Sequence, residues 1–337
     1  MIKRFSTKET RQIIVFLIVV TTLSLSIIYT NVRTFDTSQI YSTGYQDSLI
    51  YLDMYFGKYS PVLGVRRPLV PFVARLVPDL PGALFPLSRT IDPLAMVAFK
   101  FAVVNFFFLV ATCLALYFLH RGFGMNYFTA FIGTMLFLGS STVVRSAGLP
   151  LTDAAFFFFL TLNTIAIQQD NLLLLFFAQS VGVLAKELVV LISLPLILLS
   201  LLTWQRKRWM LLATLPAILI HIIIRSHMPA LPVRRHDFVF LLEVVSGQLS
   251  VLATPRGLIK LFFSFSLACI PAIYALVKCK VPLLLRHWSW AIPIVFLGVL
   301  ILKGNFDRTM FSIFPVVIPL AALGLSSWLD SESLSIK

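Results

Sequence analysis

The chain has 337 residues, of which 58% are hydrophobic and 12% are charged, and its formal net charge is +14. A single soluble globule is excluded, because so few charged residues cannot cover so much apolar surface. The composition predicts a polytopic helical membrane protein in which residues 1–337 form one transmembrane domain. The positive charge does not indicate nucleic-acid binding, since no basic–aromatic motif accompanies it and membrane proteins carry basic flanks that set their topology.

Ten apolar runs follow one another along the chain, and we expect each to be a membrane segment of an all-α transmembrane bundle. Two of them, on either side of Lys186 and Glu187, are short, which leaves open whether they are two spans or re-entrant pieces. Prolines inside several runs fit kinked helices. The approximate bounds of the runs are 12–30, 93–119, 126–143, 151–168, 172–185, 187–203, 209–225, 258–277, 289–303 and 309–329.

Basic residues before the first run set the expected orientation. Lys3, Arg4, Lys8 and Arg11 precede it, which predicts a cytoplasmic N-terminus. No small-residue cleavage site follows this run, so we expect it to be retained as an anchor. An even number of crossings then places the C-terminus in the cytoplasm as well. We therefore expect a multi-pass protein of the cytoplasmic (inner) membrane.

The long loop 31–92 is predicted to lie outside and to contain short interfacial helices. Residues 45–56 suit a helix on which Asp47 and Tyr51 are four residues apart and share a face. Apolar residues of the same stretch, such as Ile50 and Leu52, would rest on the membrane surface. A second helix is expected to start at Arg67-Pro68. Residues 226–257 form a second long outer loop, which could cover a lipid site.

Acidic residues collect on the predicted outer side, so that side is expected to be the chemical face. Arg66, Arg67, Lys186 and Arg308 lie there too, and cations held on that side suggest an anionic ligand such as a phosphate. The alternatives are contact with lipid headgroups or pairing with neighbouring acids. The ten outer acids, out of fourteen, are Asp36, Asp47, Asp53, Asp79, Asp92, Asp153, Glu187, Asp237, Glu243 and Asp307.

Three candidate groups remain open between a chemical and a structural role. Asp47, in a partly dry cleft beside Arg66 and Arg67, would be a general base, or it would simply face water. Thr152-Asp153 would cap the following helix, which does not exclude chemistry at Asp153. Lys186-Glu187 would be a neutralised pair or a phosphate contact.

Established cofactor motifs do not occur in the sequence. No His, Cys or carboxylate cluster has metal-ligand spacing, so no metal ligand is assigned, and dependence on a divalent metal stays open. No phosphate-binding loop or dinucleotide motif is present, and direct use of ATP is not expected.

Four short motifs resemble those of GT-C-type membrane glycosyltransferases and their uncharacterised bacterial relatives. Asp47-x-x-x-Tyr51 resembles the acidic motif after the first helix, and Arg67-Pro-Leu-Val-Pro-Phe-Val-Ala74 resembles a later stretch along the membrane. Leu151-Thr-Asp-Ala-Ala-Phe-Phe157 and Asn305-Phe-Asp-Arg-Thr-Met-Phe-Ser-Ile-Phe-Pro315 resemble the openings of a middle and a late helix. The family's paired acidic motif is not clear, since Asp36, Asp47 and Asp53 are spread apart.

The resemblance implies an inverting transferase of the bacterial cell envelope, which moves a sugar from a polyprenyl-phosphate donor to an acceptor outside the cytoplasm. Asp47 would then be the base, and Arg66, Arg67, Lys186 or Arg308 would bind the lipid phosphate, with Tyr51 and Asp153 beside them. The expected partners are the bilayer, the lipid-linked sugar and other membrane proteins. A non-catalytic subunit or scaffold with the same fold is the second hypothesis, and a lipid or solute transporter is the third.

Overall fold

The computed structural model describes residues 7–35, 46–57, 67–79, 93–226, 238–255, 257, 259, 264–301 and 306–335, and over these residues the chain is all-α. The helices of the main body are α1 (Thr7–Thr34), α4 (Pro93–Gly122), α5 (Tyr127–Leu138), α7 (Asp153–Gln168), α8 (Leu172–Ala185), α9 (Leu188–Leu198), α10 (Trp204–Ala213), α11 (Leu215–Ser226), α14 (Cys269–Lys278), α16 (Ala291–Ile301) and α18 (Phe314–Ser335). Connecting or flanking helices are α2 (Gln46–Tyr55), α3 (Leu69–Leu76), α6 (Ser141–Ser146), α12 (Phe238–Leu252), α15 (Leu283–Trp288) and α17 (Phe306–Met310), with 3-10 turns η3 (Ser266–Ala268) and η4 (Phe311–Ile313).

The prediction of about ten membrane segments is wrong. In the part of the chain that the structure describes, four helices are long and apolar enough to cross a membrane, or up to five if one bent pair is a single span. These helices indicate a multi-pass membrane protein. The four spans are Glu9–Arg33, Leu94–Gly122, Trp204–Ser226 and Arg308–Leu329, and the bent pair is Ser266–Lys278 with Leu283–Gly298.

Several expected segments are too short because polar or flexible residues end their helices. The helices α5, α7, α8 and α9 have 12, 16, 14 and 11 residues, whereas a crossing needs about 20. Gly139 ends α5, and extended backbone at Lys186 ends α8. Asp170, just beyond α7, has a φ of 53°, which reverses the chain. The apolar runs are real, but these breaks turn them into short pieces packed between the longer helices.

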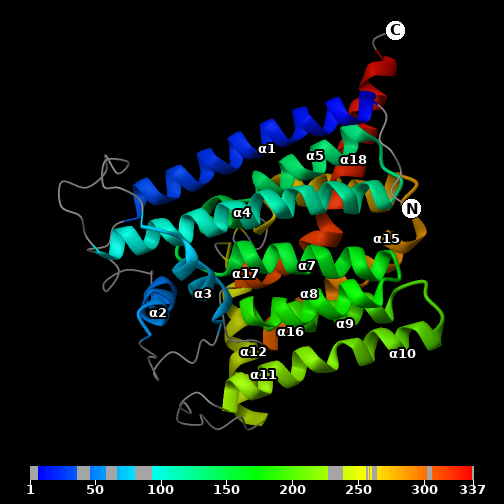
Figure 1. The fold of residues 1–337 in the computed structure, drawn as a ribbon. Helices are drawn as coiled ribbons and strands as arrows, with labels where there is room; N and C mark the ends of the chain where they lie inside the picture. The colour runs from blue at the N-terminus through cyan, green and yellow to red at the C-terminus, as the bar shows by residue number, and fades with distance from the viewer. Residues whose placement is uncertain are drawn as a thin grey trace.

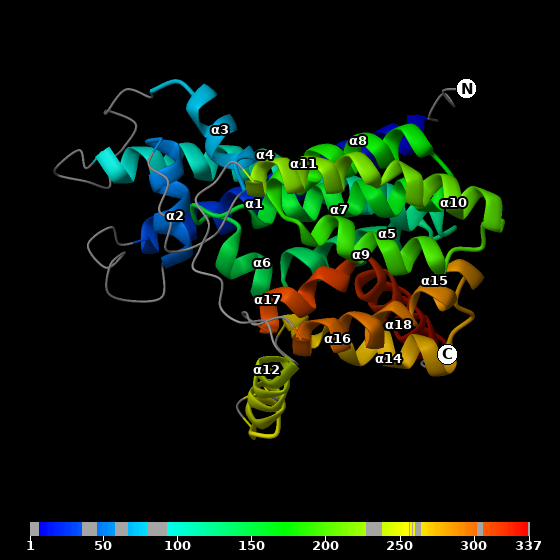
Figure 2. The ribbon, with the colours of Figure 1, turned by 90° about the horizontal axis from the view of Figure 1, so that it is seen from below.

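The helices form two layers. Figure 1 shows α1, α4, α7, α8 and the α10–α11 pair lying lengthwise beside one another. Figure 2 shows α14, α16 and α18 on one side of this layer, with α12 projecting away from the bundle. The α4 helix, with 30 residues, is about 45 Å long. The shorter α7 is level with it at one end, where Gln168 packs on Gly122, and begins well inside its length at the other.

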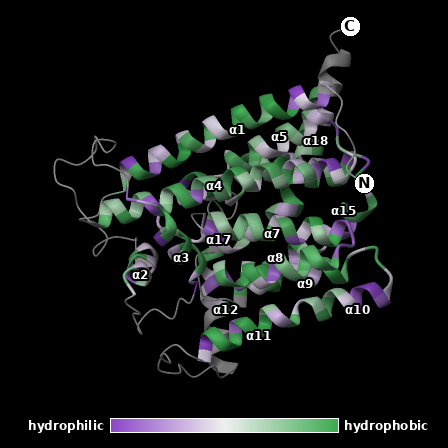
Figure 3. Ribbon diagram, in the orientation of Figure 1, coloured by the Kyte–Doolittle hydropathy of each residue, from purple (hydrophilic) through white to green (hydrophobic). Residues whose placement is uncertain are grey.

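Burial separates the centre of the bundle from the helices at its periphery. In the most apolar stretch of the α18 span 83% of residues are buried, against 22% for α1 and 17% for the α10–α11 span. Many of the outward side chains there are apolar, including Leu219 and Ile222, and α11 is predominantly green in Figure 3. Surfaces of this kind suggest contact with lipid.

Two ion pairs define the two ends of the bundle. Asp170, before α8, binds Arg206, which follows α9, so α8 and α9 form a hairpin that starts and finishes at one end. Asp153 begins α7 and binds Lys186 at the opposite tip of that hairpin. We call the Asp170 end the terminal end, because α1 begins there and α18 ends there (Figure 1). The Asp153 end is the cap end, since α2 and α3 lie over it.

Helices α2 and α3, which we call the cap, occupy the described part of the 31–92 loop. Ile50 and Leu52 are 4% and 0% exposed and pack against α3 and α4, so the prediction that they rest on the membrane surface is wrong for these two residues. Arg75 of α3 donates to the carbonyls of Met54 and Tyr55, which lie in the last turn of α2. The cap is therefore one packed unit joined to the bundle.

Candidate functional site

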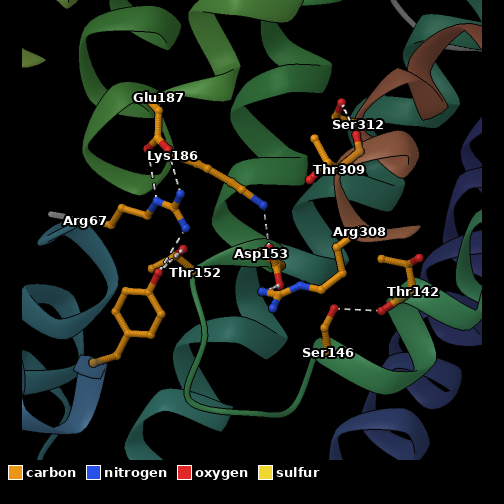
Figure 4. A network of polar contacts seen from close by, with 11 residues as sticks. Arg67, Thr142, Ser146, Thr152, Asp153, Lys186, Glu187, Arg308, Thr309 and Ser312 are labelled. Atoms are coloured by element: carbon orange, nitrogen blue, oxygen red, sulfur yellow. Dashed lines mark hydrogen bonds and ion pairs between the residues drawn. The ribbon is translucent and has the colours of Figure 1, made fainter. Parts of the chain in front are cut away.

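Three elements that are distant in sequence bring an acid and two cations together at the cap end. Lys186 Nζ lies 3.1 Å from Oδ1 of Asp153, and Arg308 Nη2 lies 2.5 Å from Oδ2. Figure 4 shows Lys186 and Arg308 converging on this carboxylate. Both oxygens of Asp153 are therefore occupied by cations. The side chain of Asp153 is 3% exposed and that of Lys186 is 6% exposed, whereas Arg308 is 22% exposed, so the acid and the lysine of this ion triad are buried and the arginine lies at its edge.

Aromatic packing beneath the triad explains why its members meet. Asp153 is four residues before Phe157 on α7, and Arg308 is three residues before Phe311, so each pair shares a helical face. The rings of Phe157 and Phe311 pack with centroids 5.4 Å apart. Lys186 also lies 4.8 Å from the ring centroid of Phe156, within the range of a cation–π contact. The apolar core thus fixes the positions of the three charged groups.

A second set of contacts joins the cap to the same end of the bundle. Arg67 donates from Nη2 to Glu187 at 2.7 Å and from Nε at 3.1 Å, which is the two-pronged geometry of a strong arginine–carboxylate pair. Its Nη1 donates to the Tyr51 hydroxyl at 3.2 Å. Thr152, directly before Asp153, donates to the same hydroxyl at 3.4 Å. The cap and the triad are therefore in contact through Tyr51 and Thr152.

Burial and charge shift the proton affinities of the cap contacts. Burial raises the pKa of Tyr51 above its usual value of 10, so its phenol stays protonated. Burial opposes ionisation of Glu187, but hydrogen bonds from Arg67 and the charge of Arg67 outweigh it, and the pKa of Glu187 falls from 4.5 to about 2. Glu187 lies in the turn between α8 and α9, outside the four candidate spans.

The structure brings five of the seven predicted site residues into one cluster, namely Tyr51, Arg67, Asp153, Lys186 and Arg308. Arg66 and the side chain of Asp47 lie outside the described residues. The backbone of Asp47 is in α2, one turn before Tyr51 and on the same helical face.

Two structural roles predicted from the sequence, an ion pair between Lys186 and Glu187 and a helix cap at Thr152, differ from what the structure has. Lys186 and Glu187 bind different partners, Asp153 and Arg67, rather than forming a neutralised pair with each other. Thr152 occupies the position before α7, but its side chain makes no capping hydrogen bond and instead reaches Tyr51. Asp153 is the first helical residue, where a negative charge is favoured by the helix dipole.

Sequence reasoning missed the partner roles of Glu187, Thr152 and Lys100. The side chain of Lys100 is 8% exposed, and its Nζ lies 2.6 Å from Asp79 and 3.2 Å from the Tyr55 hydroxyl of the cap. Its position seven residues into an apolar run was the signal, since a cation there needs an anionic partner. Figure 4 shows Thr142, Ser146 and Thr309 near Arg308, with Ser312 beside Thr309, and none of them stood out in the sequence.

The cluster carries three cations and two carboxylates, so its net charge is positive. Arg67 and Arg308 are 19% and 22% exposed, so neither is fully buried. Among the residues that the structure describes, no group of three or more His, Cys, Asp or Glu side chains could hold a metal ion. The chemistry that this arrangement offers is recognition of an anion beside a buried, positively charged core.

Comparison with known proteins assigns no family to the chain. No protein-family model matches it, and no curated protein sequence matches it.

Proposed function

We propose that the chain is an integral membrane glycosyltransferase of the GT-C-like kind, which moves a sugar from a polyprenyl-phosphate donor to an acceptor at the extracytoplasmic face. The observation that carries this proposal is the convergence of Arg67, Lys186 and Arg308 at one end of an apolar bundle. A lipid phosphate has the charge that this cluster complements and an apolar tail that suits the surface beside it. The resemblance of the four sequence motifs points to the same chemistry.

The three cations take different parts in this proposal. Arg67 and Arg308 are partly exposed and bind the phosphate oxygens of the donor. Lys186, which is 6% exposed and bound to Asp153, holds that carboxylate in place, and Asp153 in turn orients Arg308. Tyr51 remains protonated because burial raises its pKa. It accepts hydrogen bonds from Arg67 and Thr152, which leaves its own O–H to donate to the ligand.

Asp47 is the proposed base. Its carboxylate takes the proton of the acceptor hydroxyl, and the acceptor oxygen bonds to the anomeric carbon of the sugar. The bond from that carbon to the phosphate oxygen breaks, and the polyprenyl phosphate leaves with the electron pair, so the anomeric configuration inverts. Arg67 and Arg308 stabilise the charge that develops on the leaving phosphate. The support for Asp47 is its place on α2, one turn before Tyr51.

The orientation is part of the proposal. The basic residues before α1 favour a cytoplasmic terminal end, and α1 begins and α18 ends on that side of the bundle (Figure 1). The cap end then faces away from the cytoplasm, where a lipid-linked sugar would be used. The membrane would be the bacterial inner membrane.

The test is an Asp47→Asn variant in lipid nanodiscs, with a panel of polyprenyl-phosphate sugars and release of polyprenyl phosphate as the readout. Loss of a general base lowers rates by about 10²–10⁴-fold, so release should fall by at least ~100-fold while donor binding persists. Asp53→Asn is the matched control, because Asp53 is on the same helix but on another flank. Equal turnover by the Asp47→Asn variant and the wild type would exclude Asp47 as the base.

A non-catalytic subunit with this fold is the second candidate, and one observation favours it. Asp153 is neutralised by two cations and Glu187 by Arg67. These ion pairs would by themselves hold the cap on the bundle, without any catalytic role. In that case no donor in the panel would be turned over, and Asp47→Asn would leave the assembly of the protein with its membrane partners unchanged.

A further inference from the structure

Two fully buried amides lie in the apolar centre of the bundle, away from the charged cluster. Asn163 of α7 and Gln179 of α8 are both 0% exposed. Among the described residues, no hydrogen-bond partner is found for Nδ2 or Oδ1 of Asn163, or for Nε2 or Oε1 of Gln179. Asn163 is ten residues after Asp153 on α7, and therefore about 15 Å further along the helix.

The register of the α7–α8 hairpin places the two amides opposite each other. Gly182 packs directly on Phe159, since a Cβ on Gly182 would come within 2.8 Å of the Phe159 Cβ. Asn163 is four residues after Phe159, and Gln179 is three residues before Gly182. In antiparallel helices these steps lead in the same direction and stay on the facing sides, so the two amides lie at the same level.

A direct bond between the amides would not satisfy them. Each amide has two N–H donors and an oxygen with two lone pairs, and a reciprocal pair uses one donor and one lone pair of each. One N–H group of each residue would still lack an acceptor in an apolar surrounding, where backbone carbonyls are already engaged within the helices. A small molecule that both donates and accepts resolves this, and water is the one that suits a buried polar site of this kind.

We propose that Asn163 and Gln179 form an internal water site between α7 and α8, with at least one water bonded to both amides. The site is independent of the charged cluster and of the function proposed for it. The site is a fixed polar contact in the apolar centre of the bundle. The register of α7 against α8 is therefore set at two places, by this site and by the packing of Gly182 on Phe159.

The test uses the full chain in detergent, with ¹⁵N-labelled Asn and Gln, and measures transfer from water protons to the side-chain NH₂ groups. Signals are assigned by their loss in Asn163→Leu and Gln179→Leu. We expect water cross-peaks at both amides. Asn31 is the matched control: it is 7% exposed, its Nδ2 donates to Val144 O at 2.7 Å, and its Oδ1 accepts from the Gly148 N–H at 3.0 Å. Its signal is assigned by its loss in Asn31→Leu, and its water cross-peak should be absent or far weaker.

The shared water makes a further demand on the same spectra. Asn163→Leu removes one of the two amides that hold the shared water, so the water cross-peak of Gln179 should be lost or greatly weakened. Absence of water cross-peaks at both wild-type amides would overturn the proposal, as would an unchanged Gln179 cross-peak in Asn163→Leu. Equal cross-peaks at Asn31 would also overturn it, because water would then reach bonded amides as readily as unbonded ones. If Asn163→Leu does not fold, Gln179→Leu still assigns the Gln179 signal, and the wild-type water cross-peak of Gln179 is compared with that of Asn31.

Discussion

The two ends of helix α7 carry an aspartate each, and the comparison between them shows what burial does to an ion pair. Asp153 at the cap end is 3% exposed and binds two cations. Asp170 at the terminal end is 34% exposed and binds Arg206, which is 42% exposed. An exposed pair is worth little and costs little to break, whereas breaking a buried one strands charge in an apolar surrounding. The cap end therefore holds the charges whose positions matter most.

The largest expected effect is that of Asp153→Asn. It leaves Lys186 and Arg308 without their carboxylate, and the loss of one partner of a buried pair costs about 3–5 kcal/mol. The melting temperature of the purified protein should fall clearly, or the protein should fail to accumulate. Asp170→Asn is the matched control at the other end of the helix, where the expected cost is about 1 kcal/mol or less. Asparagine tolerates the positive φ of Asp170. Equal losses in the two variants would remove the distinction between the ends.

Adding Lys186→Met to the Asp153→Asn variant sharpens the comparison. The double variant no longer carries the stranded lysine, so it should be more stable than the sum of the two single losses predicts. Residues in one salt-bridge network show coupling of about 0.5–3 kcal/mol. Melting temperatures of the four proteins measure this coupling. Additive losses would show that Lys186 and Asp153 do not depend on each other.

Glu187→Gln should have a smaller effect that depends on pH. Glu187 is 39% exposed, so its pair with Arg67 is screened, and we expect a cost of about 1 kcal/mol or less. Its folded pKa of about 2 is below the ordinary 4.5, so the contribution is complete above pH 4.5 and is lost as the pH falls towards 2. The gap in melting temperature between wild type and variant should be constant from pH 7 to 5 and narrow below pH 4.5. A difference in melting temperature that widens as the pH falls would contradict a stabilising Glu187–Arg67 pair.

The sequence predicted the membrane class, the helical fold and five of the residues that meet in the cluster. The apolar runs and the charges at their ends were sufficient for this. The number of spans was wrong because short apolar runs were counted as crossings. The breaks at Asp170 and Lys186 were already visible in the sequence, but the helices that they bound have 16 and 14 residues, fewer than the about 20 that a crossing needs. Spacing along the chain also could not reveal that Glu187 binds Arg67, 120 residues away, because such contacts depend on tertiary packing.

The burial of the cap also depends on tertiary packing that the sequence does not show. The sequence around Ile50 and Leu52 is compatible with a helix on the membrane surface, because it does not show whether an apolar side chain will contact lipid or protein. Their burial against α3 and α4 depends on how the loop folds back. The helix in which they lie was predicted, and its surroundings were not.

The most direct test of the account compares lipid-phosphate binding by an arginine at each end. Polyprenyl phosphate binding to the chain in nanodiscs is measured for the wild type, Arg308→Gln and Arg206→Gln, after each variant is shown to be monodisperse. Loss of a hydrogen bond to a charged group costs about 1.5–3 kcal/mol, so Arg308→Gln should weaken binding by at least ~10-fold. Arg206→Gln should leave it unchanged. Equal affinity for all three proteins, or a loss confined to Arg206→Gln, would contradict a lipid-phosphate site at the cap end.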